Sequence, residues 1–85
     1  MSGEAHITLL AFGQIGEMIV QARRSISEGE TVEKLLNALC IEHNGLETSV
    51  EHPRFRVAVN QAVVPFDHIL RDGDEVALLS PVSGG

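Results

Sequence analysis

The sequence predicts one small α+β domain, in which a mixed β-sheet is covered on one face by a single main helix. Three observations support this fold class. Apolar runs typical of strands lie near both ends of the chain, a central stretch has the apolar spacing of an amphipathic helix, and 85 residues suffice for one modest core. Such a domain has no room for a deep active-site cleft, so a partner would have to supply one.

The first half of the chain begins with the residues expected to form a central strand. Ile7 to Phe12 is a nearly continuous apolar run, and residues 1 to 4 before it form a polar leader that we expect to be loose. The segment Gly13 to Gly16 interrupts the strand. A second, weaker strand is expected over Arg23 to Ser27.

The clearest predicted element is a helix that begins after Thr31, whose hydroxyl can cap its first turn. Asn44-Gly45 supplies a stop signal. One face is apolar at spacings of three and four residues, at Val32, Leu35, Leu36, Leu39, Cys40 and His43. This apolar face of the helix is expected to pack against a sheet.

The second half of the chain returns to β structure after a polar stretch, Glu47 to Arg54, that we expect to be a variable loop. Phe55 to Val59 and Ala62 to Val64 flank Asn60-Gln61, which is consistent with a tight hairpin. Pro65 should end the second of these strands.

The last predicted strand, Glu75 to Leu79, follows a turn at Arg71 to Asp74 and ends before Pro81. The resulting order, ββαβββ or close to it, is that of the β-grasp (ubiquitin-like) fold, in which the first and last strands are parallel neighbours. The domain is expected to span residues 1–80, with residues 81–85 as a flexible tail.

Alternation along the strands predicts which side chains the helix covers. If Val76 and Leu78 face the helix, the opposite face carries an apolar strip that includes Leu10, Phe12, Ala77 and Leu79. An uncovered apolar strip on a small domain usually marks a partner surface. The alternative is that these side chains simply complete the core.

Charge and cysteine content limit the possible partners. Twelve acidic and six basic residues give a net charge of −6, which disfavours nucleic acid and anionic membranes and suits a basic protein partner. Cys40 is the single cysteine, so no internal disulfide can form. Without a signal peptide or a long apolar run, a cytoplasmic location is expected.

Other patterns that suggest sites are weak. Gly13-Gln14-Ile15-Gly16 matches the short loop of an RNA-binding KH module, but the acidic charge opposes that interpretation. The four histidines lack metal-ligand spacing. Asp67-His68 and Asp72-Gly73-Asp74 are better explained as turns than as an acid-base pair or a calcium loop.

The end of the sequence is its most informative feature. Pro81-Val82-Ser83-Gly84-Gly85 directly follows the last predicted strand. Five extended residues reach roughly 17 Å. Two glycines can enter a narrow channel because they lack Cβ. A diglycine end can also be an inert terminus.

Four segments in a fixed order resemble the small subunit of molybdopterin synthase, the MoaD-type ubiquitin-like sulfur carriers. They are Val59-Asn60-Gln61, Phe66-Asp67-His68, Asp72 to Ala77, and the closing Pro81 to Gly85. The similarity is strong over the C-terminal third and compatible with the remainder of the chain. It favours a functional role for Gly85 over an inert terminus.

The resemblance implies a specific chemistry. A ubiquitin-activating-type adenylyltransferase would use ATP to adenylate the Gly85 carboxylate, and sulfur from a donor enzyme would replace AMP to give a thiocarboxylate. The molybdopterin synthase large subunit would then accept the tail, so that the sulfur attacks a cyclic pyranopterin precursor and builds the dithiolene. This chain would be a non-catalytic, sulfur-donating subunit that binds no cofactor itself.

The resemblance also assigns residues to roles. Phe12, Val63 and Leu79 would contact the large subunit, while Gly85 carries the reacting carboxylate. The residues that would thread the partner channel are Pro81, Val82, Ser83 and Gly84. A heterotetramer of two small and two large subunits is the assembly that the family implies.

Two alternatives remain open from the sequence. A sulfur carrier for thiazole synthesis or another pathway would share the tail and its activation but dock on a different acceptor. A ubiquitin-like modifier would instead join Gly85 to lysine amines of target proteins.

Overall fold

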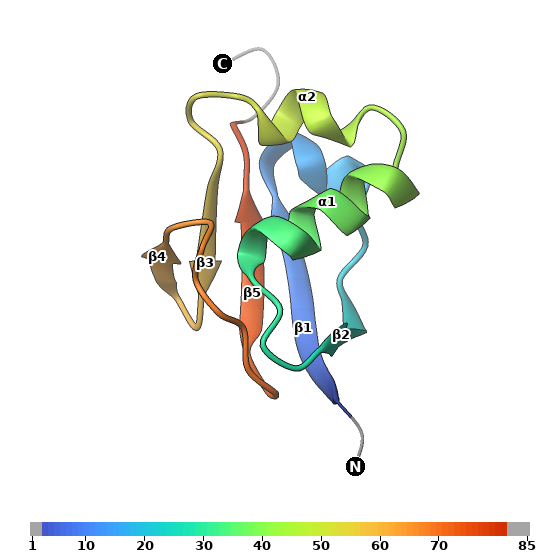
Figure 1. Cartoon of the computed structure of the whole chain (residues 1–85). Coiled ribbons are helices and arrows are strands. Elements are labelled where there is room, and N and C mark those ends of the chain that lie inside the picture. The colour runs from blue at the N-terminus through green and yellow to red at the C-terminus, as the bar shows by residue number, and fades with distance from the viewer. Residues whose placement is uncertain (1–2, 82–85) are drawn as a thin grey trace.

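A five-stranded mixed sheet with helices on one face forms the body of the molecule (Figure 1). The computed structural model describes residues 3–81. Its elements in chain order are β1 (Glu4–Phe12), the 3₁₀ helix η1 (Gly13–Glu17), β2 (Ala22–Ser27), α1 (Val32–Glu42), α2 (Leu46–Val50), β3 (Arg56–Val59), β4 (Ala62–Val64) and β5 (Glu75–Leu79).

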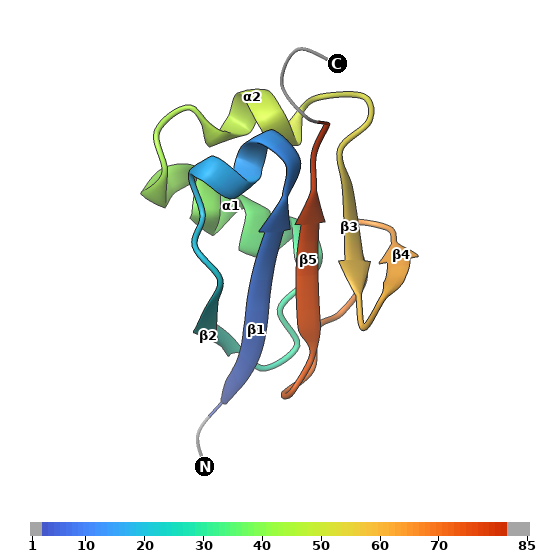
Figure 2. The ribbon, with the colours of Figure 1, turned by 180° about the vertical axis from the view of Figure 1, so that it is seen from behind.

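The strand order β2-β1-β5-β3-β4 confirms the predicted β-grasp arrangement. Strands β1 and β5 lie side by side at the centre and run parallel, with Thr8 opposite Glu75 and Phe12 opposite Leu79 (Figure 2). All other neighbouring strands are antiparallel. The last strand therefore joins the two hairpins into one sheet.

Helix α1 forms where the apolar spacing predicts it. The Thr31 hydroxyl accepts a hydrogen bond from the Lys34 backbone N–H at 3.2 Å, as an N-cap should. The buried face of the helix packs against the sheet, where Val76 and Leu78 are fully buried on the same face. The buried helix positions are Val32, Leu35, Leu36 and Leu39.

Truncating Leu35 tests how much this packing contributes to stability. Leu35 has no exposed surface, so Leu35→Ala should lower the free energy of unfolding by about 2–5 kcal/mol, through lost burial and the cavity left behind. Asn37→Ala, on the exposed side of the same helix, should change it by no more than about 0.5 kcal/mol. Urea unfolding measures both, and equal effects would contradict this account of the core.

Two turns, the hairpin turn at Asn60-Gln61 and the turn before β5, are joined by hydrogen bonds of the Asn60 and Asp74 side chains. Asn60 and Gln61 both have positive φ, 52° and 73°, which confirms the predicted tight hairpin. The Asn60 side chain donates to Asp74 Oδ1 at 2.9 Å and accepts from the Glu75 N–H at 3.0 Å. The Asp74 carboxylate also accepts from the Arg71 N–H at 2.8 Å, so this motif serves as turn chemistry.

The prediction of a loop over Glu47 to Arg54 is wrong at its start, because α2 occupies Leu46–Val50. Gly45 begins this helix at φ 90°, in the left-handed region. Leu46 is fully buried and Val50, one turn later, packs against the core, so α2 covers one end of the sheet (Figure 1). One apolar pair gave too little periodicity to reveal a single helical turn.

Strand β1 is longer than predicted, since it begins at Glu4 rather than Ile7. Ala5 and Ile7 are both buried on the helix-covered face, while His6 between them is not. The polar residues here alternate with buried ones, so the strand extends past the point where its apolar run begins. The interruption expected at Gly13 to Gly16 is η1, in which Ile15 is fully buried.

Candidate functional site

The helix-free face of the sheet carries apolar side chains on its two central strands. Leu10 lies opposite Ala77, and Phe12 lies opposite Leu79, on the parallel pair β1 and β5. These four residues alternate with the buried ones, so their side chains point away from α1. Phe12 is 54% exposed and Leu79 is half-buried.

The same face continues across β3 and β4. Ala58 pairs with Ala77 on one side and with Val63 on the other, so their side chains share this face. Val63 is 63% exposed. We call the surface formed by these residues the apolar strip: Leu10, Phe12, Ala58, Val63, Ala77 and Leu79.

The structure thus brings the three predicted contact residues onto one face. Phe12 and Leu79 are direct cross-strand neighbours at the end of the sheet where the tail begins. Val63 lies two strands away from Leu79, at the edge. Arg56, opposite Leu79, borders the strip, and its guanidinium donates to the Pro53 and Phe55 carbonyls at 2.9 and 2.8 Å.

The start of the tail is bonded to the turn that follows β1. Ser80 donates from its backbone N–H to the Phe12 carbonyl at 3.1 Å, and its hydroxyl also donates there at 3.1 Å. That hydroxyl accepts from the Ile15 N–H at 2.9 Å. The Gln14 N–H donates to the Pro81 carbonyl at 3.0 Å. We call Ser80 and Pro81, held in this way, the tail root.

Gly13 makes this close contact possible. Its φ is +81°, and a Cβ at this position would lie 1.8 Å from the Ser80 carbonyl oxygen. Any side chain here would push the tail root away from η1. Sequence reasoning interpreted Gly13 only as a strand terminator. The signal that was missed is that Gly13 directly follows β1, the strand that pairs in parallel with the last strand, β5.

The predicted tail residues are only partly within the described range. Pro81 is half-buried and belongs to the tail root. Val82, Ser83, Gly84 and Gly85 lie outside the described residues. The body of the site is therefore the apolar strip and the tail root, which meet where β5 ends.

Three further features of residues 3–81 bear on possible sites. No three His, Cys, Asp or Glu side chains in that range gather closely enough to hold a metal ion. Burial, aided by the nearby charges of Glu47 and Glu51, raises the pKa of the Cys40 thiol, so it is not an activated nucleophile. Helices within the range are too short or too polar to cross a membrane.

Comparisons with known proteins agree with this architecture. The model of the ThiS family matches residues 9–85. The molybdopterin synthase sulfur carrier subunit of Escherichia coli is 38% identical over 80 residues, covering 93% of this chain and 99% of that protein. The corresponding subunit of Mycobacterium tuberculosis is 32% identical over 82 residues, covering 93% and 96%.

Solved structures add a second kind of relative. The crystal structure of SAMP1 from Haloferax volcanii has a TM-score of 0.80 at 27% identity, covering 95% of this chain and all of that one. Urm1 from Trypanosoma brucei has a TM-score of 0.70 at 24% identity, with full coverage of both chains, and shows a shared fold.

Proposed function

The chain belongs to the ThiS family, and from this premise we propose that it is the sulfur carrier subunit of a molybdopterin synthase. The observation that carries the proposal is the 38% identity to the Escherichia coli sulfur carrier subunit over nearly the whole of both chains. The match to the family model runs over residues 9–85, so it includes the strip, the tail root and the C-terminal residues together.

The proposed reaction begins at the Gly85 carboxylate, which is a poor electrophile. An activating enzyme transfers AMP from ATP to this carboxylate and releases pyrophosphate. A sulfur nucleophile at the sulfide level then displaces AMP and leaves a C-terminal thiocarboxylate. The sulfur becomes a protein-bound nucleophile and is never released as free sulfide.

The body of the domain then positions this sulfur for transfer. We propose that the apolar strip docks on the large subunit while the tail enters its active site. The four residues beyond Pro81 reach at most about 14 Å, so docking restricts the sulfur to a small volume. An encounter between dilute reactants becomes an effectively intramolecular step. Groups that protonate or bind the pterin precursor would belong to the large subunit.

Intact mass after loading tests this proposal. The chain is incubated with ATP, a molybdopterin-pathway activating enzyme and a sulfur donor. We expect a gain equal to the replacement of one oxygen by sulfur, and no gain in a variant that lacks Gly85. Absence of the gain in the full chain, with an enzyme competent on another carrier, would refute sulfur carriage.

A second candidate function has one specific observation in its favour. The chain is 27% identical to SAMP1, a small archaeal modifier protein, over almost its full length. A modifier would form isopeptide bonds between Gly85 and lysine amines. A ladder of conjugates in cells, dependent on Gly85, would favour this function, while conversion of the pterin precursor by loaded chain and large subunit would favour sulfur transfer.

A further inference from the structure

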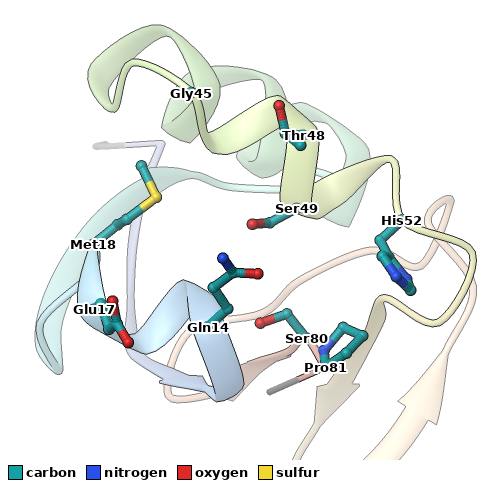
Figure 3. A pocket seen from close by; sticks show the side chains of 9 residues that line it. All are labelled: Gln14, Glu17, Met18, Gly45, Thr48, Ser49, His52, Ser80 and Pro81. Carbon is teal, nitrogen blue, oxygen red and sulfur yellow. The ribbon is translucent and has the colours of Figure 1, made fainter. Parts of the chain in front are cut away.

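A pocket of about 290 Å³ lies beside the tail root (Figure 3). Its walls come from η1, from α2 and from the tail root itself. Gln14 and Ser49 reach into it from opposite walls, and Ser80 and Pro81 close one side (Figure 3). Whatever fills this pocket therefore touches the start of the tail.

The polar side chains of the pocket have unused hydrogen-bonding capacity. Within residues 3–81, no hydrogen bond or ion pair engages the side chains of Gln14, Glu17, Thr48 or Ser49. Each of them offers an oxygen that can accept a hydrogen bond, and the Glu17 carboxylate can only accept. The Gln14 amide and the two hydroxyls can also donate, so the pocket can accept hydrogen bonds from an incoming donor, and Glu17 is the group that restricts its partner to a donor.

The charges around the pocket favour a cation. Glu17 contributes a negative charge, and no Lys or Arg lines the pocket. His52, at its rim, accepts a hydrogen bond from the Arg54 N–H through Nδ1 at 3.0 Å. The whole chain carries a net charge of −6. Arginine and lysine are the side chains that match this environment, since both are positive and donate only.

The size and openness of the pocket point to a protein side chain. At about 290 Å³ it falls at or below the small end of the range for small-molecule sites, and its walls are largely exposed polar residues. An arginine or lysine carried by a docked protein needs no enclosing cavity, because the surrounding interface excludes water from it.

From these observations we propose that the pocket receives an arginine or lysine side chain of the activating enzyme. The inference rests on the proposed function. Adenylation brings the Gly85 carboxylate next to the phosphates of ATP, so we expect the activating enzyme to carry cationic groups along the path of the tail. A cation seated against the tail root would align the tail with that path.

Charge reversal at Glu17 tests the pocket. Glu17→Lys should lower kcat/KM for loading by about tenfold or more, chiefly by raising KM, with a smaller loss at high salt. Glu28→Lys makes the same charge change at the other end of the sheet and should stay within about twofold of the parent chain. A neutral double variant, Gln14→Ala with Ser49→Ala, should lose about fivefold without any change in charge.

Three results separate the possible outcomes. Thermal unfolding first shows that each variant is folded. If the unmodified chain loads sulfur but Glu17→Lys and Glu28→Lys load equally well, the pocket proposal is wrong and the proposed function stands. If Glu17→Lys loads normally and instead fails to bind the large subunit, the assignment to the activating enzyme is wrong. If the unmodified chain gains no sulfur, both proposals fail together.

Discussion

Replacing Leu79 with aspartate is expected to weaken binding to the large subunit about a hundredfold, close to 3 kcal/mol. Leu79 is half-buried beside the 54% exposed Phe12, on the part of the strip closest to the tail root. In the proposed complex both side chains lose their remaining contact with water. A carboxylate at this position would be desolvated without a partner, and apolar contact would be lost as well.

The domain itself should tolerate Leu79→Asp, because the Leu79 side chain points away from α1 and the buried core. Isothermal titration calorimetry measures the affinity, and circular dichroism checks the fold. Ile41→Asp is a matched control, since Ile41 is 86% exposed and lies on α1, which covers the other face. It should bind normally. Unchanged affinity of Leu79→Asp would remove the apolar strip from the interface.

Gly13→Ala is expected to lower the free energy of unfolding by about 3 kcal/mol or more. A side chain at φ +81° costs about 1–2 kcal/mol by itself. The new Cβ would also lie 1.8 Å from the backbone oxygen of Ser80, so the tail root must move. Its hydrogen bonds to Phe12, Gln14 and Ile15, each worth about 1 kcal/mol, would be strained or lost.

Gly29 provides a control that separates backbone strain from collision. Its φ is +82°, nearly that of Gly13, but nothing lies within 4 Å of its ideal Cβ. Gly29→Ala should therefore show only the cost of the left-handed backbone, about 1–2 kcal/mol. Urea unfolding compares the two variants. Equal losses of stability would mean that the contact between Gly13 and the tail root contributes nothing.

The elements that sequence reasoning predicted well are those with a repeated local signal. Helix α1 shows four buried positions at helical spacing, and β5 alternates buried and half-buried residues over its length. Alternation grouped Val76 with Leu78 and Ala77 with Leu79 on opposite faces, and the structure shows that the first pair is the covered one. Recognising the order of elements then sufficed to place β1 beside β5.

The features that were missed depend on distant pairs or on a single turn. Helix α2 has one apolar pair, Leu46 and Val50, within a polar sequence, which is too little for a periodic signal. The contact of Gly13 with Ser80 joins positions 67 residues apart and exists only because the parallel register of β1 and β5 places them together. The pocket needs both of these features, so it was not predictable either.

The central place of β5 has a consequence for synthesis of the protein on the ribosome. Strand β5 lies between β1 and β3, so the two hairpins cannot join into one sheet until residues 75–79 have left the exit tunnel. Nascent chains that stop earlier lack the centre of the sheet, and with it Ala77 and Leu79 of the apolar strip. A large subunit that docks on the complete apolar strip would therefore bind prematurely terminated chains poorly.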